Sequence, residues 1–363
     1  MSTESEFDAP AWLKNRHAQT IFPSTPLCRA PSPVFRRERI ELPDGDFVEA
    51  DWLGDVTDRT RPLVVVLHGL EGSSESTYAR MLMQSVVDTG WSGVVLHFRG
   101  CGGSSNRLPR RYHAGDTDDV AYFLRSLRQQ YGDRTILGVG YSLGGNVLMK
   151  LLGESSAGDY VDAAVGVSVP YDLHDSAKAL ERGGSRFYQR HLLRNMRRAM
   201  KQKYTPASTP FDWQMAMQAT TFYEFDDIVT APLHGFKNAN EYYTRSSCRP
   251  YLRNIEVPSL LLGSLDDPFM TPGAYPDDAE LSATTSAEFS ETGGHVGFIY
   301  GQGGPWNARY WLPERILRYF VSDLGVGRSR SQSIRPQKKP GQARFRNGRL
   351  GALIRRPHRP PSC

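Results

Sequence analysis

Short continuous apolar runs alternate with amphipathic segments along most of the chain. Leu63–Leu67 is an uninterrupted leucine and valine run between a proline and a glycine, which is typical of a strand buried on both faces of a parallel sheet. Thr77–Asp88 follows with apolar residues at helical spacing. The same alternation predicts further strands at 93–98, 135–141, 163–169, 259–262 and 287–290, and helices at 116–130, 143–152 and 306–321. Such alternation predicts an α/β fold with a mostly parallel, doubly wound sheet.

Three parts of the chain depart from this alternation. Residues 1–35 hold several prolines and little periodicity, and we expect an irregular N-terminal arm. Segments 39–42 and 47–52 flank a Pro-Asp-Gly-Asp turn, which predicts a β-hairpin. Between Val169 and Ser259 the alternation stops, and residues 171–250 are expected to form a helical cap inserted over the site. The core is then built from 36–170 and 251–324.

Charge divides the chain into an acidic body and a basic end. The 363 residues carry a net charge of +5, but eleven basic residues and no acidic one follow Gly327. The remainder holds 33 basic and 39 acidic residues, a net charge of −6. The composition of 325–363 predicts a disordered basic tail. Such a tail can bind phosphates of RNA or of an anionic membrane. We favour a solvated extension without a partner over nucleic-acid binding.

Composition also bears on compartment and cofactors. The four cysteines are far apart and form no metal-ligand spacing, which is typical of reduced thiols. The N-terminus is polar, and the longest apolar runs are far shorter than a membrane span. We therefore expect a cytoplasmic protein with no cofactor and no metal.

Residues 140–144 read Gly-Tyr-Ser-Leu-Gly, with a predicted strand before them and a predicted helix after them. A serine on such a strand-turn-helix corner is exposed as a nucleophile, and the helix N-terminus faces the developing negative charge. Ser142 is therefore the candidate nucleophile.

A base and an acid are needed to activate this serine, and they are expected later in the chain, in the order acid, then histidine. His295 lies in a glycine-flanked loop after the last predicted strand of the sheet. Asp266 and Asp267 both follow the predicted strand 259–262. Only one of two adjacent aspartates can hold the imidazole; we favour Asp267, with Asp266 as the alternative.

The oxyanion formed during acyl transfer needs two backbone N–H donors. One is expected from Leu143, directly after the serine, and the second from Leu70, in the loop after the strand Leu63–Leu67. His68 in that loop is a further base candidate, but its expected role is to orient the loop.

With these residues in place, the chain resembles the YheT-type branch of the α/β-hydrolases, which is related to plant embryogenesis-associated and mammalian membrane-linked hydrolases. The resemblance covers about residues 10–323 and includes the segments 15–20, 41–46, 68–72, 98–103, 106–107, 112–113, 140–146, 224–227, 266–269 and 293–298. It implies an α/β-hydrolase fold, a Ser142–Asp267–His295 triad and activity on esters or lipids with short or medium acyl chains, without a cofactor.

Two cap segments allow competing interpretations. Residues 187–202 form a basic amphipathic helix, which could rest on an anionic membrane; the favoured alternative is a cap helix with solvated arginines. Residues 224–227, Glu-Phe-Asp-Asp, are expected to cap a helix or anchor the cap rather than to bind a metal.

The sequence thus predicts a serine hydrolase that cleaves a carboxylic ester through an acyl-enzyme. An amidase or aminopeptidase on the same triad is an alternative, because fold alone does not set the substrate. The second alternative is a non-catalytic scaffold that binds RNA or membrane through its tail.

Overall fold

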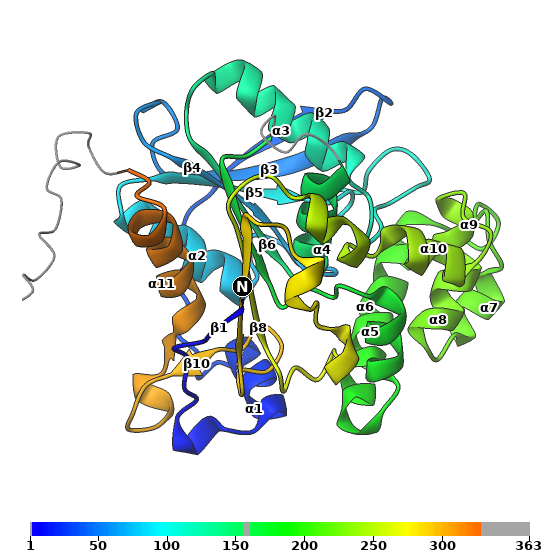
Figure 1. The fold of residues 1–363 in the computed structure, drawn as a ribbon. Helices are drawn as coiled ribbons and strands as arrows, with labels where there is room; N and C mark the ends of the chain where they lie inside the picture. The colour runs from blue at the N-terminus through cyan, green and yellow to red at the C-terminus, as the bar shows by residue number, and fades with distance from the viewer. Residues whose placement is uncertain (1, 155–159, 328–363) are drawn as a thin grey trace, which may run out of the picture. The chain divides into compact units, whose positions relative to one another are not determined.

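One nine-stranded sheet organises the molecule, with the strand order β1-β9-β8-β7-β6-β4-β5-β3-β2 (Figure 1). The structure is a computed structural model that describes residues 2–154 and 160–327. All neighbouring strands are parallel except β2 with β3 and β3 with β5. The sheet strands are β1 (Ser2–Glu4), β2 (Arg36–Glu41), β3 (Phe47–Leu53), β4 (Leu63–Leu67), β5 (Ser92–His97), β6 (Ile136–Tyr141), β7 (Ala163–Val167), β8 (Ser259–Ser264) and β9 (Thr285–Ser290).

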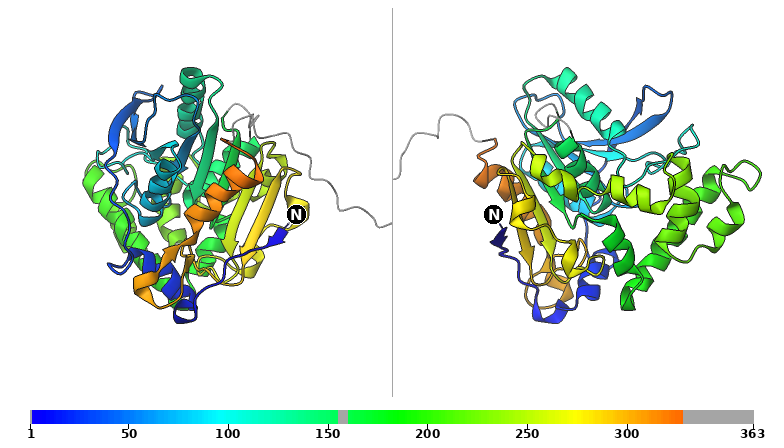
Figure 2. Two further views of the ribbon diagram at one scale, coloured as in Figure 1. Left: turned by 90° about the vertical axis from the view of Figure 1, so that its left-hand side faces the viewer. Right: turned by 45° about the vertical axis from the view of Figure 1, so that its right-hand side comes forward.

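Helices cover both faces of this sheet and build a separate layer above one edge. They are α1 (Arg16–Ile21), α2 (Thr77–Asp88), α3 (Asp118–Tyr131), α4 (Leu143–Glu154), α5 (Leu173–Leu180), α6 (Arg186–Lys203), α7 (Trp213–Gln218), α8 (Phe222–Phe225), α9 (Ala231–Leu233), α10 (Ala239–Ser246) and α11 (Trp311–Arg318). Helices α2 and α11 pack on one face and α3 and α4 on the other, while α5 to α10 extend to one side (Figures 1 and 2). The predicted fold class, a mostly parallel doubly wound α/β sheet, is confirmed.

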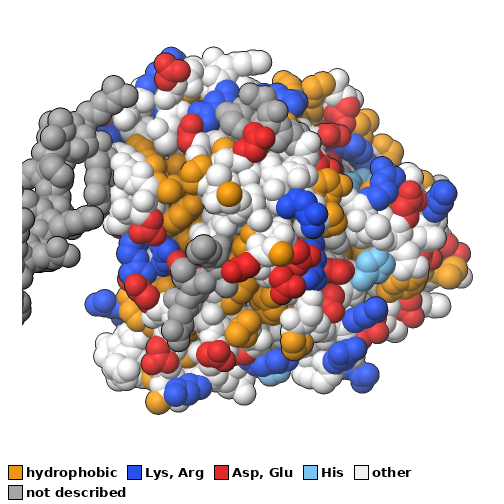
Figure 3. All heavy atoms as spheres, in the orientation of Figure 1, with side chains coloured by type: hydrophobic (Ala, Val, Ile, Leu, Met, Phe, Trp, Pro, Cys, Tyr) orange, Lys and Arg blue, Asp and Glu red, His pale blue; other side chains and the backbone are white. Residues whose placement is uncertain are grey.

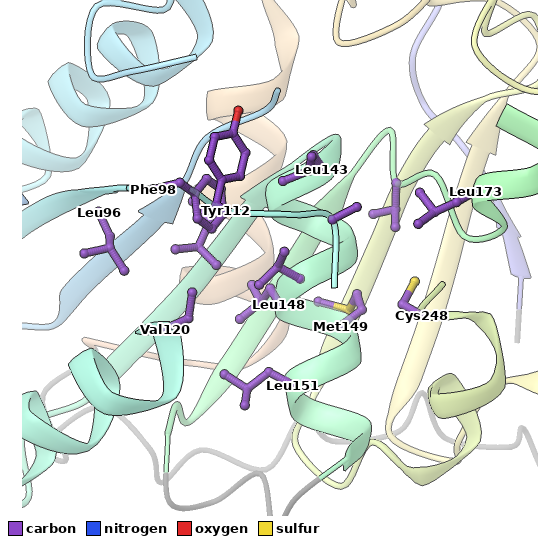
Figure 4. Close-up of a cluster of buried hydrophobic side chains, with 14 of the residues drawn as sticks. Leu96, Phe98, Tyr112, Val120, Leu143, Leu148, Met149, Leu151, Leu173 and Cys248 are labelled. Atoms are coloured by element: carbon purple, nitrogen blue, oxygen red, sulfur yellow. The ribbon is translucent and has the colours of Figure 1, made fainter. Parts of the chain in front are cut away.

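Two hydrophobic cores explain why the sheet strands read as continuous apolar runs. On β4, Leu63, Val65 and Leu67 face the core with α3 and α4, and Val64 and Val66 face the core with α2 and α11. All five side chains are at most 2% exposed. Figure 4 shows the first of these cores, where side chains of the sheet meet those of α3 and α4. A strand buried on both faces has no polar side to alternate with.

The segment between β7 and β8 is helical. Between β7 and β8 the chain forms α5 to α10 and no strand within the described residues of this segment. Lys, Arg, Asp and Glu side chains are interspersed over the face of the molecule seen in Figure 3. Among the described helices, none is long and apolar enough to cross a bilayer.

The N-terminal arm is not irregular, contrary to expectation. Its first residues pair with β9 as the parallel edge strand β1. Helix α1 follows, and the side chain of Asn15 caps it by accepting from two backbone N–H groups, those of His17 and Ala18. Elements of three and six residues are too short to show a periodicity in the sequence.

The last predicted helix also begins later than expected. Residues 309–310 form β11 and pair with β10 (Ile299–Tyr300), so α11 starts only at Trp311. This pairing joins segments on either side of a glycine-rich loop, which helical spacing could not reveal. The expected disordered tail lies, from Arg328 onward, outside the described residues.

Candidate active site

Ser142 lies on a sharp turn between β6 and α4, at the carboxyl edge of the sheet. Its φ of 50° is in the left-handed region, which a non-glycine residue adopts only when the surroundings impose it. The glycines on either side allow this turn. A Cβ atom on Gly140 would lie 2.5 Å from the carbonyl oxygen of Gly144, and one on Gly144 would lie 2.4 Å from that of Leu67. Both positions are therefore restricted to glycine by close backbone contact.

His295 and Asp267 are brought to this serine by the neighbouring strands. The Nε2 atom of His295 is 2.9 Å from the Oγ of Ser142, and its Nδ1 is 2.8 Å from the Oδ2 of Asp267. Because an ionised carboxylate can only accept, this arrangement has Nδ1–H donating to Asp267 and Nε2 accepting from the serine hydroxyl. Asp267 is 2% exposed, and its hydrogen bond with the histidine is therefore largely shielded from solvent.

Asp266, the alternative acid, has a different contact. Its Oδ1 accepts a hydrogen bond of 2.9 Å from the backbone N–H of Gly294, one residue before the histidine. Burial raises the pKa of its carboxyl group. The two adjacent aspartates thus face different parts of one loop: Asp267 the imidazole and Asp266 the backbone.

The histidine loop is also held by side chains that the sequence did not single out. The N–H of His295 donates to Thr20 Oγ1 at 2.9 Å, and that of Val296 donates to Ser168 Oγ at 3.1 Å. Gln19 is fully buried and both donates to and accepts from the backbone of Ile299. Gln19 and Thr20 belong to a segment that carried the family resemblance, but nothing in the sequence connected it to the histidine.

An aromatic stack covers the imidazole. The ring of Phe269 lies parallel to that of His295, with ring centroids 3.9 Å apart and planes at 7°. Tyr188 of α6 packs against Phe269, and its hydroxyl is 3.1 Å from Nδ1 of His17. The loop that carries Asp267 and Phe269, helix α6 of the cap and the N-terminal arm therefore meet next to the histidine.

The loop after β4 lies against Ser142 and is fixed on both sides of Leu70. The N–H of Gly69 donates to the hydroxyl of Tyr78 at 2.9 Å, and the N–H of Glu71 donates to the hydroxyl of Tyr112 at 2.8 Å. A Cβ on Gly69 would be 3.4 Å from that of Ser142. Leu70 and Ser142 border the same cavity, and Leu143 borders it too.

His68 orients this loop rather than facing the serine. It is fully buried, its Nε2 accepts from the N–H of Phe98 at 3.2 Å, and its Nδ1 is 2.7 Å from the carbonyl oxygen of Gly69. These partners require the neutral imidazole with the proton on Nδ1. Burial lowers the pKa of His68 to about 3, so the ring stays neutral at physiological pH.

Two hollows meet at Ser142 and His295. The first, which we call the inner cavity, has a volume of about 130 Å³ and is walled mainly by apolar side chains of the cap and the core. Leu173 of α5 and Leu192 and Met196 of α6 line it. The second, which we call the outer groove, has a volume of about 600 Å³ and is bordered by the arm, the β4 loop and α6. Ser142 and His295 therefore border both the inner cavity and the outer groove.

One cluster among the described residues has side chains that could hold a metal ion. Single ligand atoms of His113, Asp116 and His234 lie within 4.8 Å of one another. Burial lowers the pKa of His113 to about 2, helped by the charges of other groups, among them Lys150 and Arg110. The neutral imidazoles suit a metal, whereas the nearby cations oppose one. Of the three residues, His113 also lines the cavity at Ser142.

The comparisons with known proteins identify the family of the chain. Residues 62–302 match the α/β hydrolase fold family. The chain is 39% identical over 334 residues to YheT of Escherichia coli (strain K12), a protein named as an esterase. The match covers 89% of this chain and 95% of that protein. It is 30% identical to a monoacylglycerol lipase of Saccharomyces cerevisiae, over 74% of this chain and 62% of that protein.

A solved structure extends the likeness to the fold. The esterase Pf2001 of Pyrococcus furiosus superposes with a TM-score of 0.50 at 16% identity, over 80% of this chain and 90% of its own. At this identity the likeness concerns the fold alone. Together with the relatives above, it supports one assignment: the chain belongs to the α/β-hydrolase family, in its YheT branch of esterase- and lipase-type hydrolases.

Proposed function

We propose that this protein hydrolyses carboxylic esters with Ser142 as nucleophile, His295 as base and Asp267 as the group that orients the base. The observation that carries the proposal is the hydrogen-bonded chain from serine to histidine to aspartate, with distances of 2.9 and 2.8 Å, where the inner cavity and the outer groove meet. A serine hydroxyl needs such a base to attack a carbonyl carbon.

In the proposed reaction, Ser142 attacks the ester carbonyl while His295 Nε2 takes its proton. The imidazolium that forms is stabilised by Asp267. The N–H groups of Leu70 and Leu143 donate to the oxyanion. His295 then gives its proton to the leaving alcohol, and water attacks the acyl-enzyme by the same steps, releasing the acid and freeing Ser142.

The two hollows suit the two parts of an ester substrate, the acyl group and the alcohol. The inner cavity has the apolar walls that an acyl chain requires. The outer groove is the larger of the two hollows and also borders His295, from which the leaving alcohol takes its proton. We propose that the acyl group lies in the inner cavity and the alcohol in the outer groove, with the helical cap 171–250 as the cover of both.

A chain-length series of p-nitrophenyl esters tests this function, with p-nitroanilides of the same acids alongside. Wild type is expected to hydrolyse the esters, Ser142→Ala to lose nearly all turnover while keeping its melting temperature, and a fluorophosphonate to label Ser142 in intact protein. Turnover that persists in Ser142→Ala, or folded wild type with neither turnover nor label, would refute the proposal. A preference for the anilides would show an amidase on the same triad.

The surface beside the outer groove suits an anionic membrane as the source of substrate. Helix α6 presents an exposed row of arginines at four-residue spacing, and it contains no acidic residue. Next to this row, the side chain of Phe187 is 62% exposed, and that of Ile21 across the groove is 41% exposed. Cations beside exposed apolar side chains are typical of surfaces that rest on anionic headgroups. The arginine row consists of Arg186, Arg190, Arg194 and Arg198.

Vesicle sedimentation tests this contact in the full chain, so that the basic tail is present in every sample. We expect binding to phosphatidylglycerol vesicles that weakens with salt, and loss of most of it when the arginine row is changed to glutamine. A variant with the exposed Arg59 and Arg253 changed instead serves as the control. Equal binding by the two variants would exclude α6 as the contact.

A further inference from the structure

The wall of the inner cavity holds a carboxyl group that ester hydrolysis itself does not require. Asp226 lines the cavity together with Thr230 and Tyr243, and only 6% of Asp226 is exposed. It begins a π-helical turn, Asp226–Thr230, between α8 and α9 of the cap. Buried carboxylates are costly, and π-helical turns are frequent at functional sites.

The contacts of Asp226 separate it from the two acidic residues beside it in the sequence. Glu224 closes a capping box with Thr221 at the start of α8, and Asp227 accepts from the N–H of Ala239 at the start of α10. Those two carboxylates fulfil the expectation that residues 224–227 cap helices. Asp226 instead contacts side chains that also line the cavity.

Two hydroxyl groups bind Asp226 but leave it capacity to accept more. Thr230 donates to its Oδ1 at 2.6 Å and Tyr243 donates to its Oδ2 at 2.8 Å. Each carboxylate oxygen can accept two hydrogen bonds. No ion pair of Asp226 is found within residues 2–154 and 160–327. Burial raises its pKa to about 6, against the effect of the two hydroxyls, so the group is mostly ionised at neutral pH.

An ionised carboxylate in the wall of an apolar cavity discriminates between acyl groups. An alkyl terminus placed against Asp226 would displace water without replacing the lost hydrogen bond, which is unfavourable. A hydroxyl at that position would donate to the free lone pairs of the carboxylate. Sites built to hydrogen-bond a substrate hydroxyl reject analogues without it more strongly than apolar pockets reject an added group.

We propose that the inner cavity takes an acyl group with a hydroxyl remote from the ester carbonyl, and that Asp226 accepts the hydrogen bond of this hydroxyl. The inference rests on the proposed function and names its substrate class: esters of hydroxy fatty acids. Asp226 acts as a specificity determinant, and Thr230 and Tyr243 hold its carboxylate toward the cavity.

Matched esters test this proposal. The kcat/KM values of p-nitrophenyl hexanoate and octanoate are compared with those of their ω-hydroxy counterparts. Wild type is expected to favour a hydroxy ester by about tenfold or more, the size of one hydrogen bond to a charged group. Asp226→Asn is expected to lower this ratio by about tenfold, because the charge and one acceptor oxygen are lost.

Asp227→Asn is the matched control, since it changes the adjacent carboxylate that caps α10, and it is expected to keep the wild-type ratio. A wild-type ratio of one or less at both chain lengths would overturn the proposal, as would equal losses in the two variants. Tyr243→Phe, which removes one donor to Asp226, is a second variant if Asp226→Asn does not fold, and it is expected to change the same ratio.

Binding to Ser142→Ala separates this inference from the proposed function. Calorimetry with free ω-hydroxy and unsubstituted acids reports the preference without turnover, and tighter binding of the hydroxy acid is expected. Equal or weaker binding would overturn the hydroxyl site even if esters are hydrolysed. Absence of ester turnover in wild type would refute the hydrolase proposal. Calorimetry alone would then decide whether the cavity prefers hydroxy acids over unsubstituted acids.

Discussion

Replacing Thr20 by valine should impair catalysis through the histidine loop, although Thr20 is not part of the proposed triad. Thr20 Oγ1 accepts the N–H of His295 at 2.9 Å and donates to the carbonyl of Arg16 at 2.8 Å. Valine keeps the shape and removes the acceptor. A backbone N–H left without an acceptor costs about 1–3 kcal/mol. If that cost destabilises the position in which the imidazole can take the proton of Ser142, kcat/KM decreases by about 5- to 150-fold.

The assay is kcat/KM for the preferred p-nitrophenyl ester, with the fluorophosphonate labelling rate as a second measure of serine reactivity. Thr20→Ser keeps the hydroxyl and should retain most activity. Thr25→Val removes a hydroxyl from the same arm, where it donates to Phe22 at 2.8 Å and does not reach the histidine loop; it should be near wild type. Equal activity in Thr20→Val and Thr25→Val, or equal damage in Thr20→Ser and Thr20→Val, would refute the reasoning.

Three further results are expected. Asp267→Asn should lower kcat by about 10³–10⁴-fold because the histidine loses its orienting acceptor, and Asp266→Asn by less than about tenfold; the reverse ranking in steady-state kinetics would show the wrong assignment. Gly144→Ala should yield little folded protein, measured as soluble yield and by circular dichroism, because its Cβ would lie 2.4 Å from a backbone oxygen; a well-folded, active variant would contradict the close contact. Because the pKa of His68 is about 3 rather than 6.5, its contribution to stability is present above pH 6.5 and is lost as the pH falls toward 3. In urea unfolding, the stability advantage of wild type over His68→Asn should therefore shrink by about 2 kcal/mol between pH 7 and pH 5, and a constant difference would exclude this coupling.

Local patterns predicted the corner that carries Ser142 and the strands of the sheet other than β1. Each of these features depends on residues within a few positions of one another: β4 is a continuous apolar run, and Gly140 and Gly144 flank the serine. Asp267 was favoured because the acid is expected after a late strand and before the histidine in the chain, with Asp266 as the alternative.

Contacts between distant segments could not be predicted in the same way. The hydrogen bond from His295 to Thr20 spans 275 residues, and that between Gln19 and Ile299 spans 280. Nothing in the local composition of the arm indicates a partner at the other end of the chain. The role of Asp226 was hidden for a related reason, because its two neighbours Glu224 and Asp227 have the capping tasks that acidic residues commonly perform.

The arm that braces the histidine loop also has a consequence for the order of folding. Because the loop is held by Gln19 and Thr20, its final geometry depends on contacts between the two ends of the described chain. Closing a loop of that length is slow relative to forming the local helices and neighbouring strand pairs. During refolding, we therefore expect recovery of helix content to precede recovery of enzymatic activity, so that activity marks the completion of the fold rather than the formation of its core.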